Sequence, residues 1–180
     1  MNLTKKLRVA IGTISLAPLV AGIMVGVATP AVAPTKAEAI TAKQTLQVRT
    51  LAKYANADSL NDKQLIELLS AVGFKGQDLK EAWAIAKKES HGNPLSHNGN
   101  RKTGDNSYGL FQVNMLGSLG DTRRDKYSLK SNAELLNPVV NAQVAYHMSN
   151  GGKDWSAWKG VKTKVVKYWL SKFPSSKQKS

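Results

Sequence analysis

The sequence predicts a mainly α-helical single domain that follows an N-terminal export segment. Apolar residues recur at helical spacings in several segments of the 180-residue chain, whereas no alternating strand pattern of useful length occurs. The chain has no internal repeat and no cysteine, so neither a solenoid nor a disulfide framework is expected. Without the export segment roughly 140 residues remain, close to the commonest size of one domain, about 100 to 150 residues.

The first 33 residues are typical of a signal peptide. Three basic residues lie in the first eight, and residues 9–28 are uncharged and apolar. Small residues at 31–33 and at 37–39 provide two candidate cleavage sites. The apolar stretch is also close to the roughly 20 residues that cross a bilayer, so an uncleaved membrane anchor is the alternative. We therefore expect a secreted or cell-envelope protein.

Composition shifts divide the chain into three parts. Residues 1–39 are expected to be the signal peptide and a short linker, in which residues 30–39 are rich in Pro, Ala and Thr and should be extended. Residues 40–173 carry the helical patterns and form the expected domain. Residues 174–180 should be a basic, disordered tail.

Two helices are expected in the first third of the domain. Residues 41–54 are compatible with one, and residues 59–72 predict a second, which Ser59 or Asn61 caps. The apolar positions of the second recur at spacings of three, four and seven: Leu65, Leu68, Leu69 and Val72. Gly73 follows the last of them and is expected to end the helix.

Asp78 begins the next predicted helix, at the end of which an acidic residue occupies an unusual position. Its apolar positions, expected in the core, are Leu79, Ala82, Trp83 and Ala86. Glu89 falls within about 20° of Ala82 around the helix axis, at the edge of the apolar face. Partial burial and the negative end of the helix dipole both disfavour a charged carboxylate there. Glu89 is therefore a candidate general acid, and a solvated helix end is the alternative.

The second half of the domain is expected to contain a loop and two more helices. Residues 91–106 are rich in Gly and Asn and predict a long loop, which a short apolar run at 108–115 follows. A helix is expected from Asn137-Pro138, because proline suits the first helical turn, to the glycine pair after residue 150. Residues 161–173 predict the last helix.

Two sequence blocks carry the chemistry. They are Glu89-Ser90-His91-Gly92-Asn93-Pro94 and, after a polar loop, Ser107-Tyr108-Gly109-Leu110-Phe111-Gln112-Val113-Asn114. Together they resemble the lysozyme-like superfamily, in particular soluble-type lytic transglycosylases and goose-type lysozymes. In that family a Glu-Ser segment ends a helix, and a Gly-Leu-(Met/Phe)-Gln-(Ile/Val) segment lines the opposite side of the cleft. The likeness, to domains of phages and Gram-positive bacteria, covers roughly residues 60–160 and implies a lysozyme-like fold acting on peptidoglycan.

The resemblance also implies roles for single residues. Glu89 matches the catalytic acid, and the segment 109–112 matches the cleft wall. The implied substrate-binding residues are Ser90, Tyr108, Gly109, Leu110, Phe111, Gln112, Asn114 and Trp158. Aromatic rings suit the C–H faces of sugars, which makes candidates of Tyr108, Phe111, Trp155 and Trp158. Core packing is the alternative interpretation for each ring.

The number of carboxylates bears on the reaction. Hydrolysis by the usual glycosidase scheme needs two carboxylates, and Asp105 is the best second one, although aspartates in loops commonly serve turns. With Glu89 alone, the resemblance favours the lytic transglycosylase route, which forms 1,6-anhydro-N-acetylmuramic acid and consumes no water. One departure weakens it: the family's later Ala-Tyr-Asn-(Ala/Pro)-Gly motif has no counterpart, since Ala145-Tyr146-His147-Met148 differs too much. A muramidase that uses Glu89 and Asp105 is the alternative.

Charge indicates the partners. The formal net charge of +14 becomes +11 without residues 1–33, which hold three basic and no acidic residues. Such a charge fits anionic wall polymers, anionic lipid and nucleic acid, and the export segment favours partners in the cell envelope beside peptidoglycan glycan strands. A non-catalytic cationic wall-binding or membrane-active protein is the alternative from another class. Nucleic acid is not expected, because the sequence has no recognised nucleic-acid-binding module. The three histidines lack metal-binding spacing, so neither a metal nor a cofactor is expected, and a monomer is the default.

Overall fold

The computed structural model describes residues 35–174. The predicted signal peptide and nearly all of the predicted basic tail lie outside these residues. Within residues 35–174, no helix is both long and apolar enough to cross a bilayer.

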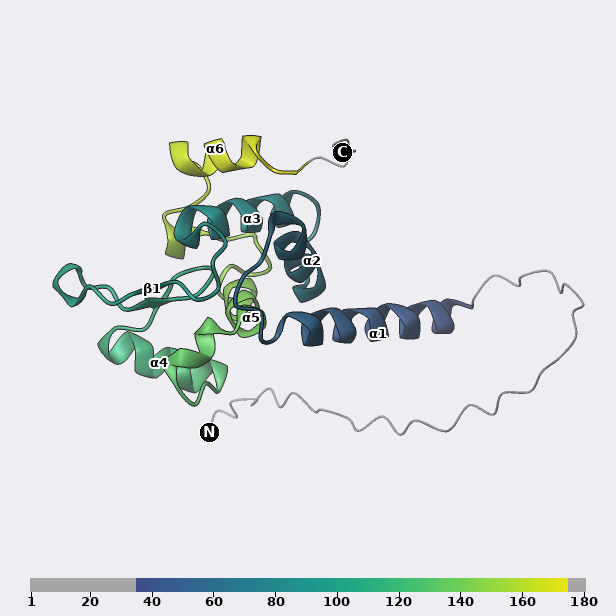
Figure 1. Ribbon diagram of the computed structural model, residues 1–180, viewed down its shortest axis with the longest axis horizontal. Helices are drawn as coiled ribbons and strands as arrows, with labels where there is room; N and C mark the ends of the chain where they lie inside the picture. Colours follow the sequence, from purple (N-terminus) through teal and green to yellow (C-terminus); the bar gives the residue numbers. More distant parts are fainter. Residues whose placement is uncertain (1–34, 175–180) are drawn as a thin grey trace, which may run out of the picture. The chain divides into compact units, whose positions relative to one another are not determined.

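The described chain is mainly α-helical, as the sequence predicts (Figure 1). The α-helices are α1 (Lys36–Tyr54), α2 (Asp62–Val72), α3 (Gly76–Ser90), α4 (Gly117–Tyr127), α5 (Pro138–Met148) and α6 (Lys164–Ser171). Short strands β1 (His97–Asn98), β2 (Ser107–Tyr108) and β3 (Val113–Asn114) form one sheet. Three 3-10 helices are η1 (Arg101–Thr103), η2 (Asn132–Leu136) and η3 (Ser156–Trp158).

Helix α1 begins earlier than the sequence pattern predicts. The prediction of an extended linker at 30–39 is wrong for residues 36–39, which are helical. A capping box explains the early start, because the Thr35 hydroxyl accepts a hydrogen bond from the Glu38 amide while the Glu38 carboxylate accepts one from the Thr35 amide. The pattern of apolar residues did not reveal this start, since most of the helix is exposed.

The next two helices follow the predictions closely. Asn61 caps α2 and forms a capping box with Gln64, while Gly73 ends the helix at a φ of 132°, which favours glycine. Helix α3 begins at Gly76, two residues before the predicted start at Asp78. Its predicted core positions are buried, apart from the half-buried Leu79.

Two elements were not predicted. The first is the antiparallel sheet β1-β2-β3, in which His97 pairs with Tyr108, and Tyr108 pairs with Val113. Strands of two residues are too short to show an alternating pattern. Helix α4 has only Gly120 buried and therefore lacks an apolar face that the sequence would reveal.

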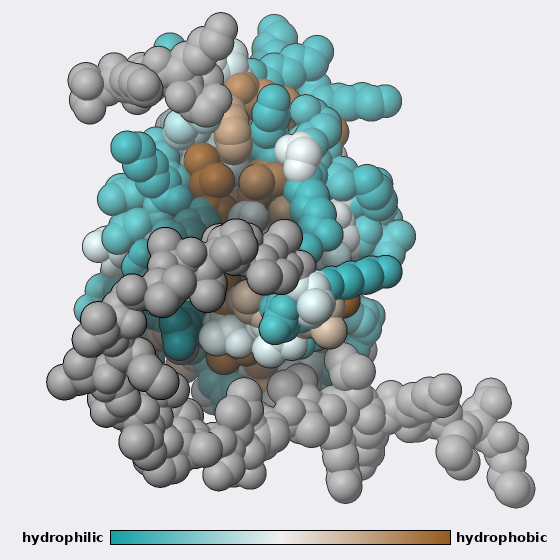
Figure 2. All heavy atoms as spheres, turned by 90° about the vertical axis from the view of Figure 1, so that its right-hand side faces the viewer, coloured by the Kyte–Doolittle hydropathy of each residue, from teal (hydrophilic) through white to brown (hydrophobic). Residues whose placement is uncertain are grey.

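Helix α3 lies at the centre of the core, and its residues 82–86 are completely buried. On one side, α2 and α5 supply further buried residues, and the rings of Phe74, Phe111 and Trp155 stack at centroid distances of 5.9 to 6.4 Å. On another side α6 packs along α3, as the yellow helix shows in Figure 1. On the face seen in Figure 2, hydrophilic side chains flank a band of hydrophobic ones.

Candidate functional site

Glu89 lies in the last turn of α3, with 21% of its side chain exposed. One of its oxygens, Oε1, accepts a hydrogen bond of 2.8 Å from the ammonium group of Lys88, which is 20% exposed. A carboxylate and an ammonium that are both largely shielded interact more strongly than an exposed pair. The other oxygen, Oε2, has no protein partner within the described residues.

The two neighbours of Glu89 are tied to different parts of the chain. Lys88 donates a second hydrogen bond, of 2.9 Å, to the carbonyl oxygen of Trp158 in η3. The buried hydroxyl of Ser90 donates to the carbonyl oxygen of Leu110 at 2.8 Å and accepts from the amide of Gly92 at 3.2 Å. These bonds fix the backbone on both sides of Glu89.

A further hydrogen bond joins these two anchors. The indole Nε1 of Trp158 donates to the carbonyl oxygen of Phe111 at 2.6 Å, and Phe111 directly follows Leu110. The bonds from Lys88 and Ser90 therefore belong to one circuit that closes through the backbone of residues 88–90, and we call it the Glu89 circuit. Its members are Lys88, Ser90, Leu110, Phe111 and Trp158.

The predicted cleft wall, 109–112, is tightly built. At Gly109, with φ of 72°, an added Cβ would lie 2.2 Å from the carbonyl oxygen of Leu135, so no side chain fits. Gln112 has a φ of 46°, and its side-chain amide donates to the carbonyl oxygens of Ser96 and Gly109 at 3.0 and 2.9 Å. The wall is therefore a preformed backbone turn that Gln112 braces.

Asn141 holds this wall in place, and the sequence analysis missed it. Its side chain is completely buried, and its amide group donates to the carbonyl oxygens of Tyr108 and Leu135, both at 2.8 Å. Its carbonyl oxygen accepts from the amide of Phe111 at 2.9 Å. One sequence signal could have identified Asn141, since it is a polar residue among the apolar positions of the predicted helix. A polar side chain that is buried in this way needs hydrogen-bond partners.

The structure places several predicted binding residues in the core. Leu110 and Phe111 are completely buried, while Trp155 and Trp158 are 4% and 5% exposed. The rings of Phe111, Trp155 and Trp158 therefore pack in the core, as the alternative interpretation predicted. Their contact with sugar stays a prediction. Ser90 is likewise buried, with its hydroxyl engaged in the Glu89 circuit.

Three predicted residues keep accessible surface. Tyr108 is half-buried, and its ring stacks on that of His97 with centroids 4.4 Å apart. Gln112 and Asn114 are also partly exposed, although Asn114 serves its own loop by accepting from the Leu116 amide and donating to the carbonyl oxygen of Gly104. These side chains are the best placed of the predicted set to meet a ligand.

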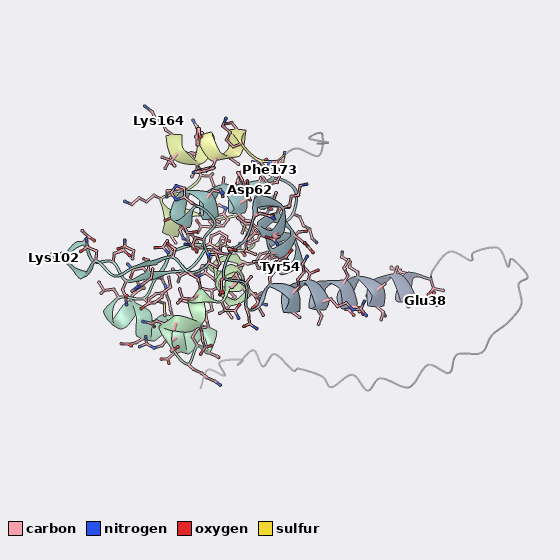
Figure 3. All side chains as sticks on the ribbon, in the orientation of Figure 1. Glu38, Tyr54, Asp62, Lys102, Lys164 and Phe173 are labelled. Atoms are coloured by element: carbon pink, nitrogen blue, oxygen red, sulfur yellow. The ribbon has the colours of Figure 1, made fainter. Side chains whose placement is uncertain are left out.

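Asp105, the predicted second carboxylate, lies at the base of the β1-β2 loop. One of its oxygens accepts a hydrogen bond of 2.7 Å from Asn98, and the other accepts one from the hydroxyl of Ser107. Both oxygens therefore have partners within the hairpin, which fits the common role of loop aspartates in forming turns. The tip of this hairpin, where Lys102 lies in Figure 3, extends away from the helices.

The described residues contain no cluster of three or more His, Cys, Asp or Glu side chains that suits a metal ion. Two surface hollows are found elsewhere, one along α1 between Ala37 and Arg49 and one that Asn56, Leu95 and Pro138 line, and Glu89 lines neither. The Glu89 circuit is thus the best supported candidate site.

Comparison with known protein families decides the relationship. A family model described as a lysozyme-like domain matches residues 66–160, which include both sequence blocks and every member of the Glu89 circuit. The chain belongs to this lysozyme-like family. Neither a curated protein nor a solved structure matches the chain. As a lysozyme-like protein, it is a peptidoglycan-cleaving enzyme of the glycosidase type, and all of α1 and all of α6 lie outside the matched residues.

Proposed function

We propose that the protein is a lytic transglycosylase, which cuts the β-1,4 bond between N-acetylmuramic acid and N-acetylglucosamine with Glu89 as acid and then as base. The observation that carries the proposal is a shielded carboxylate whose two neighbours are anchored in a closed hydrogen-bond circuit. Asp105 supports the same choice, because its two oxygens are engaged within the hairpin. A route that needs one carboxylate therefore fits better than one that needs two.

In the first step, protonated Glu89 donates its proton from Oε2 to the oxygen that bridges the two sugars. The bond between that oxygen and C1 of N-acetylmuramic acid breaks, and the N-acetylglucosamine unit leaves with a free hydroxyl group. Glu89 becomes a carboxylate in this step. The Lys88 ammonium, 2.8 Å from Oε1, stabilises the charge that develops there.

In the second step, the Glu89 carboxylate accepts the proton of the C6 hydroxyl on the same N-acetylmuramic acid unit. The C6 oxygen then bonds to C1 and closes the 1,6-anhydro ring. Glu89 is protonated again, so the cycle is balanced without water. One group acts as acid and then as base, which requires its carboxyl to stay in one position between the steps. The circuit that fixes Lys88 and Ser90 supports that requirement.

The glycan strand is proposed to lie against the partly exposed side chains of Tyr108, Gln112 and Asn114. The ring of Tyr108, braced by His97, offers an apolar face for a pyranose ring. Export through the N-terminal segment is part of the proposal, because the polymer that the enzyme cuts lies outside the membrane.

The test is mass spectrometry of the soluble fragments that the full-length protein releases from purified peptidoglycan. The expected products end in 1,6-anhydro-N-acetylmuramic acid, and Glu89→Gln is expected to reduce their formation by about 100-fold or more. Glu81→Gln is the matched control, since Glu81 lies on the same helix and bonds only to Gln77 in the described residues.

Other products would contradict the proposal in distinct ways. Reducing ends that contain one additional water would make the enzyme a muramidase and return Asp105 to the second catalytic position. Full activity of Glu89→Gln would remove Glu89 from the reaction. Failure of the wild-type chain to release fragments from any peptidoglycan would favour the cationic wall-binding protein.

A further inference from the structure

The chain has a strongly basic C-terminal segment. No acidic residue follows Asp154, whereas seven lysines do. Five of them lie within the described residues, and all five are exposed: Lys159, Lys162, Lys164, Lys167 and Lys172. We call these five the α6 lysines, after the helix that carries or adjoins them.

None of the α6 lysines forms an ion pair with a carboxylate within residues 35–174. Lysines elsewhere in the same range do pair, for example Lys53 with Glu67 and Lys153 with Asp78. The charge of the α6 lysines is therefore not neutralised locally, and it adds to one positive surface potential.

The other side of α6 is already covered. Val166 is completely buried, and the ring of Trp169 meets those of Trp83 and His91 edge-on at centroid distances of 6.1 and 5.9 Å. After α6, Phe173 packs edge-on against Trp83 at 5.4 Å. Figure 3 shows the result, with the Lys164 side chain extending away from α3. The helix thus packs its larger apolar side on α3, and its charged side, together with Val165 and Tyr168, faces outward.

We propose that the α6 lysines bind the phosphodiester backbone of an anionic cell-wall polymer. Several exposed, separate ammonium groups on one segment suit an extended polyanion with repeated phosphates better than one small anion, which needs converging donors. Tyr168, 55% exposed with the Lys172 ammonium 5.8 Å from its ring centre, adds an aromatic face to this surface. Because Val166 is buried and Trp169 packs on α3, only Val165 and Tyr168 are left as exposed apolar groups of α6, which favours the polymer over an anionic membrane.

This surface is distinct from the Glu89 circuit. Four of the five α6 lysines follow residue 160, where the lysozyme-like match ends. Binding a polymer attached to the wall would hold the enzyme near its insoluble substrate and raise the local concentration of cleavable bonds. The inference rests on the proposed action at the wall, though not on the chemistry of Glu89.

The experiment is sedimentation of the full-length protein with purified walls that either keep or have lost their phosphate-containing polymers. Wild-type protein is expected to bind the complete walls about tenfold more tightly, with an affinity that falls as salt is added. The triple variant Lys164→Gln, Lys167→Gln and Lys172→Gln is expected to lose this difference. The same three positions changed to Arg should retain it, because the positive charge is kept.

A matched control separates the surface from total charge. The triple variant Lys43→Gln, Lys63→Gln and Lys130→Gln also removes three exposed positive charges and is expected to bind like the wild type. Equal loss in both triple variants would overturn the proposal and leave net charge as the cause. Equal binding of wild type to both kinds of wall would also overturn it, as would lysine-dependent binding to anionic lipid vesicles in preference to the polymer.

A second readout keeps this inference separate from the transglycosylase proposal. The α6 triple variant should release fragments at the wild-type rate from peptidoglycan stripped of phosphate polymers. Lost release with retained binding would point to a fault in the catalytic site. If circular dichroism shows that the triple variant folds poorly, the single variants Lys164→Gln and Lys167→Gln replace it. Each of them is expected to weaken binding to complete walls, and unchanged binding of both would overturn the proposal.

Discussion

Helix α3 has two neighbours that are attached to it in different ways. Its C-terminal end meets Leu110 and η3 through hydrogen bonds of defined geometry, from the Ser90 hydroxyl to the carbonyl oxygen of Leu110 and from the Lys88 ammonium to that of Trp158. Helix α6 instead packs along α3 through rings and aliphatic groups such as Trp169 and Val166. Directional bonds fix positions closely, whereas apolar packing tolerates changes of shape. The catalytic proposal belongs to the first neighbour and the polymer-binding proposal to the second.

The largest expected effect of breaking the polar side is at Asn141. Asn141→Leu removes three buried hydrogen bonds and leaves the carbonyl oxygens of Tyr108 and Leu135 without these donors. Because each unsatisfied buried group costs about 1 to 3 kcal/mol, we expect the free energy of unfolding to fall by about 3 to 5 kcal/mol. Urea unfolding followed by circular dichroism measures it. Gln143→Leu on the exposed side of the same helix is the control, and an equal loss there would contradict the assigned role.

The next effect concerns catalysis rather than folding. Lys88→Met removes the ammonium group that contacts Glu89 and Trp158, so kcat is expected to fall about 10- to 100-fold with little change in KM. Lys88→Arg should recover part of kcat, because a guanidinium keeps the charge. Release of muropeptides at several peptidoglycan concentrations gives both constants.

Lys87→Met is the matched control for this prediction. Lys87 precedes Lys88 but pairs with Asp62 of α2 at 3.0 Å, away from the Glu89 circuit. Its removal should leave kcat unchanged. A kcat for Lys88→Met equal to that of the wild type would show that the ion pair with Glu89 has no role in the reaction.

The apolar side should respond more mildly. Trp169→Leu removes the aromatic contacts with Trp83 and His91. Because the Trp169 side chain is only half-buried, we expect the free energy of unfolding to fall by about 1 to 2 kcal/mol. Fragment release from stripped peptidoglycan should stay at the wild-type rate. A large drop in kcat would show that α6 also positions the catalytic end of α3, and the contrast between the two neighbours would fail.

The sequence predicted local features of the fold, such as helices, better than the hydrogen bonds between distant segments. Helices α2 and α5 were predictable from apolar positions and capping residues, and α3 from its apolar positions, because these are local signals. Glu89 was found through its position at a helix end beside a recognisable sequence block. The circuit was not predictable, since it joins residues 20 to 70 positions apart, as Ser90 with Leu110 and Lys88 with Trp158. Sequence patterns likewise could not separate a ring that lines a cleft from one that fills the core, as Trp158 shows.

The smallest effect is expected at a partly exposed polar contact far from Glu89 in the sequence. Between α1 and α2, the Tyr54 hydroxyl donates to Glu67 at 2.5 Å, and this bond, followed by the one from Lys53, lowers the pKa of Glu67 from its ordinary value of 4.5. A lowered pKa in the folded state means that the stabilisation is complete above about pH 4.5 and is lost as the pH falls through the lowered value. Tyr54→Phe should remove most of this acid dependence. Because Glu67 is 46% exposed, the difference should stay below about 1 kcal/mol in unfolding measured between pH 3 and 7. A larger acid-dependent loss would mean that α1 is held to the domain as firmly as the wall beside Glu89.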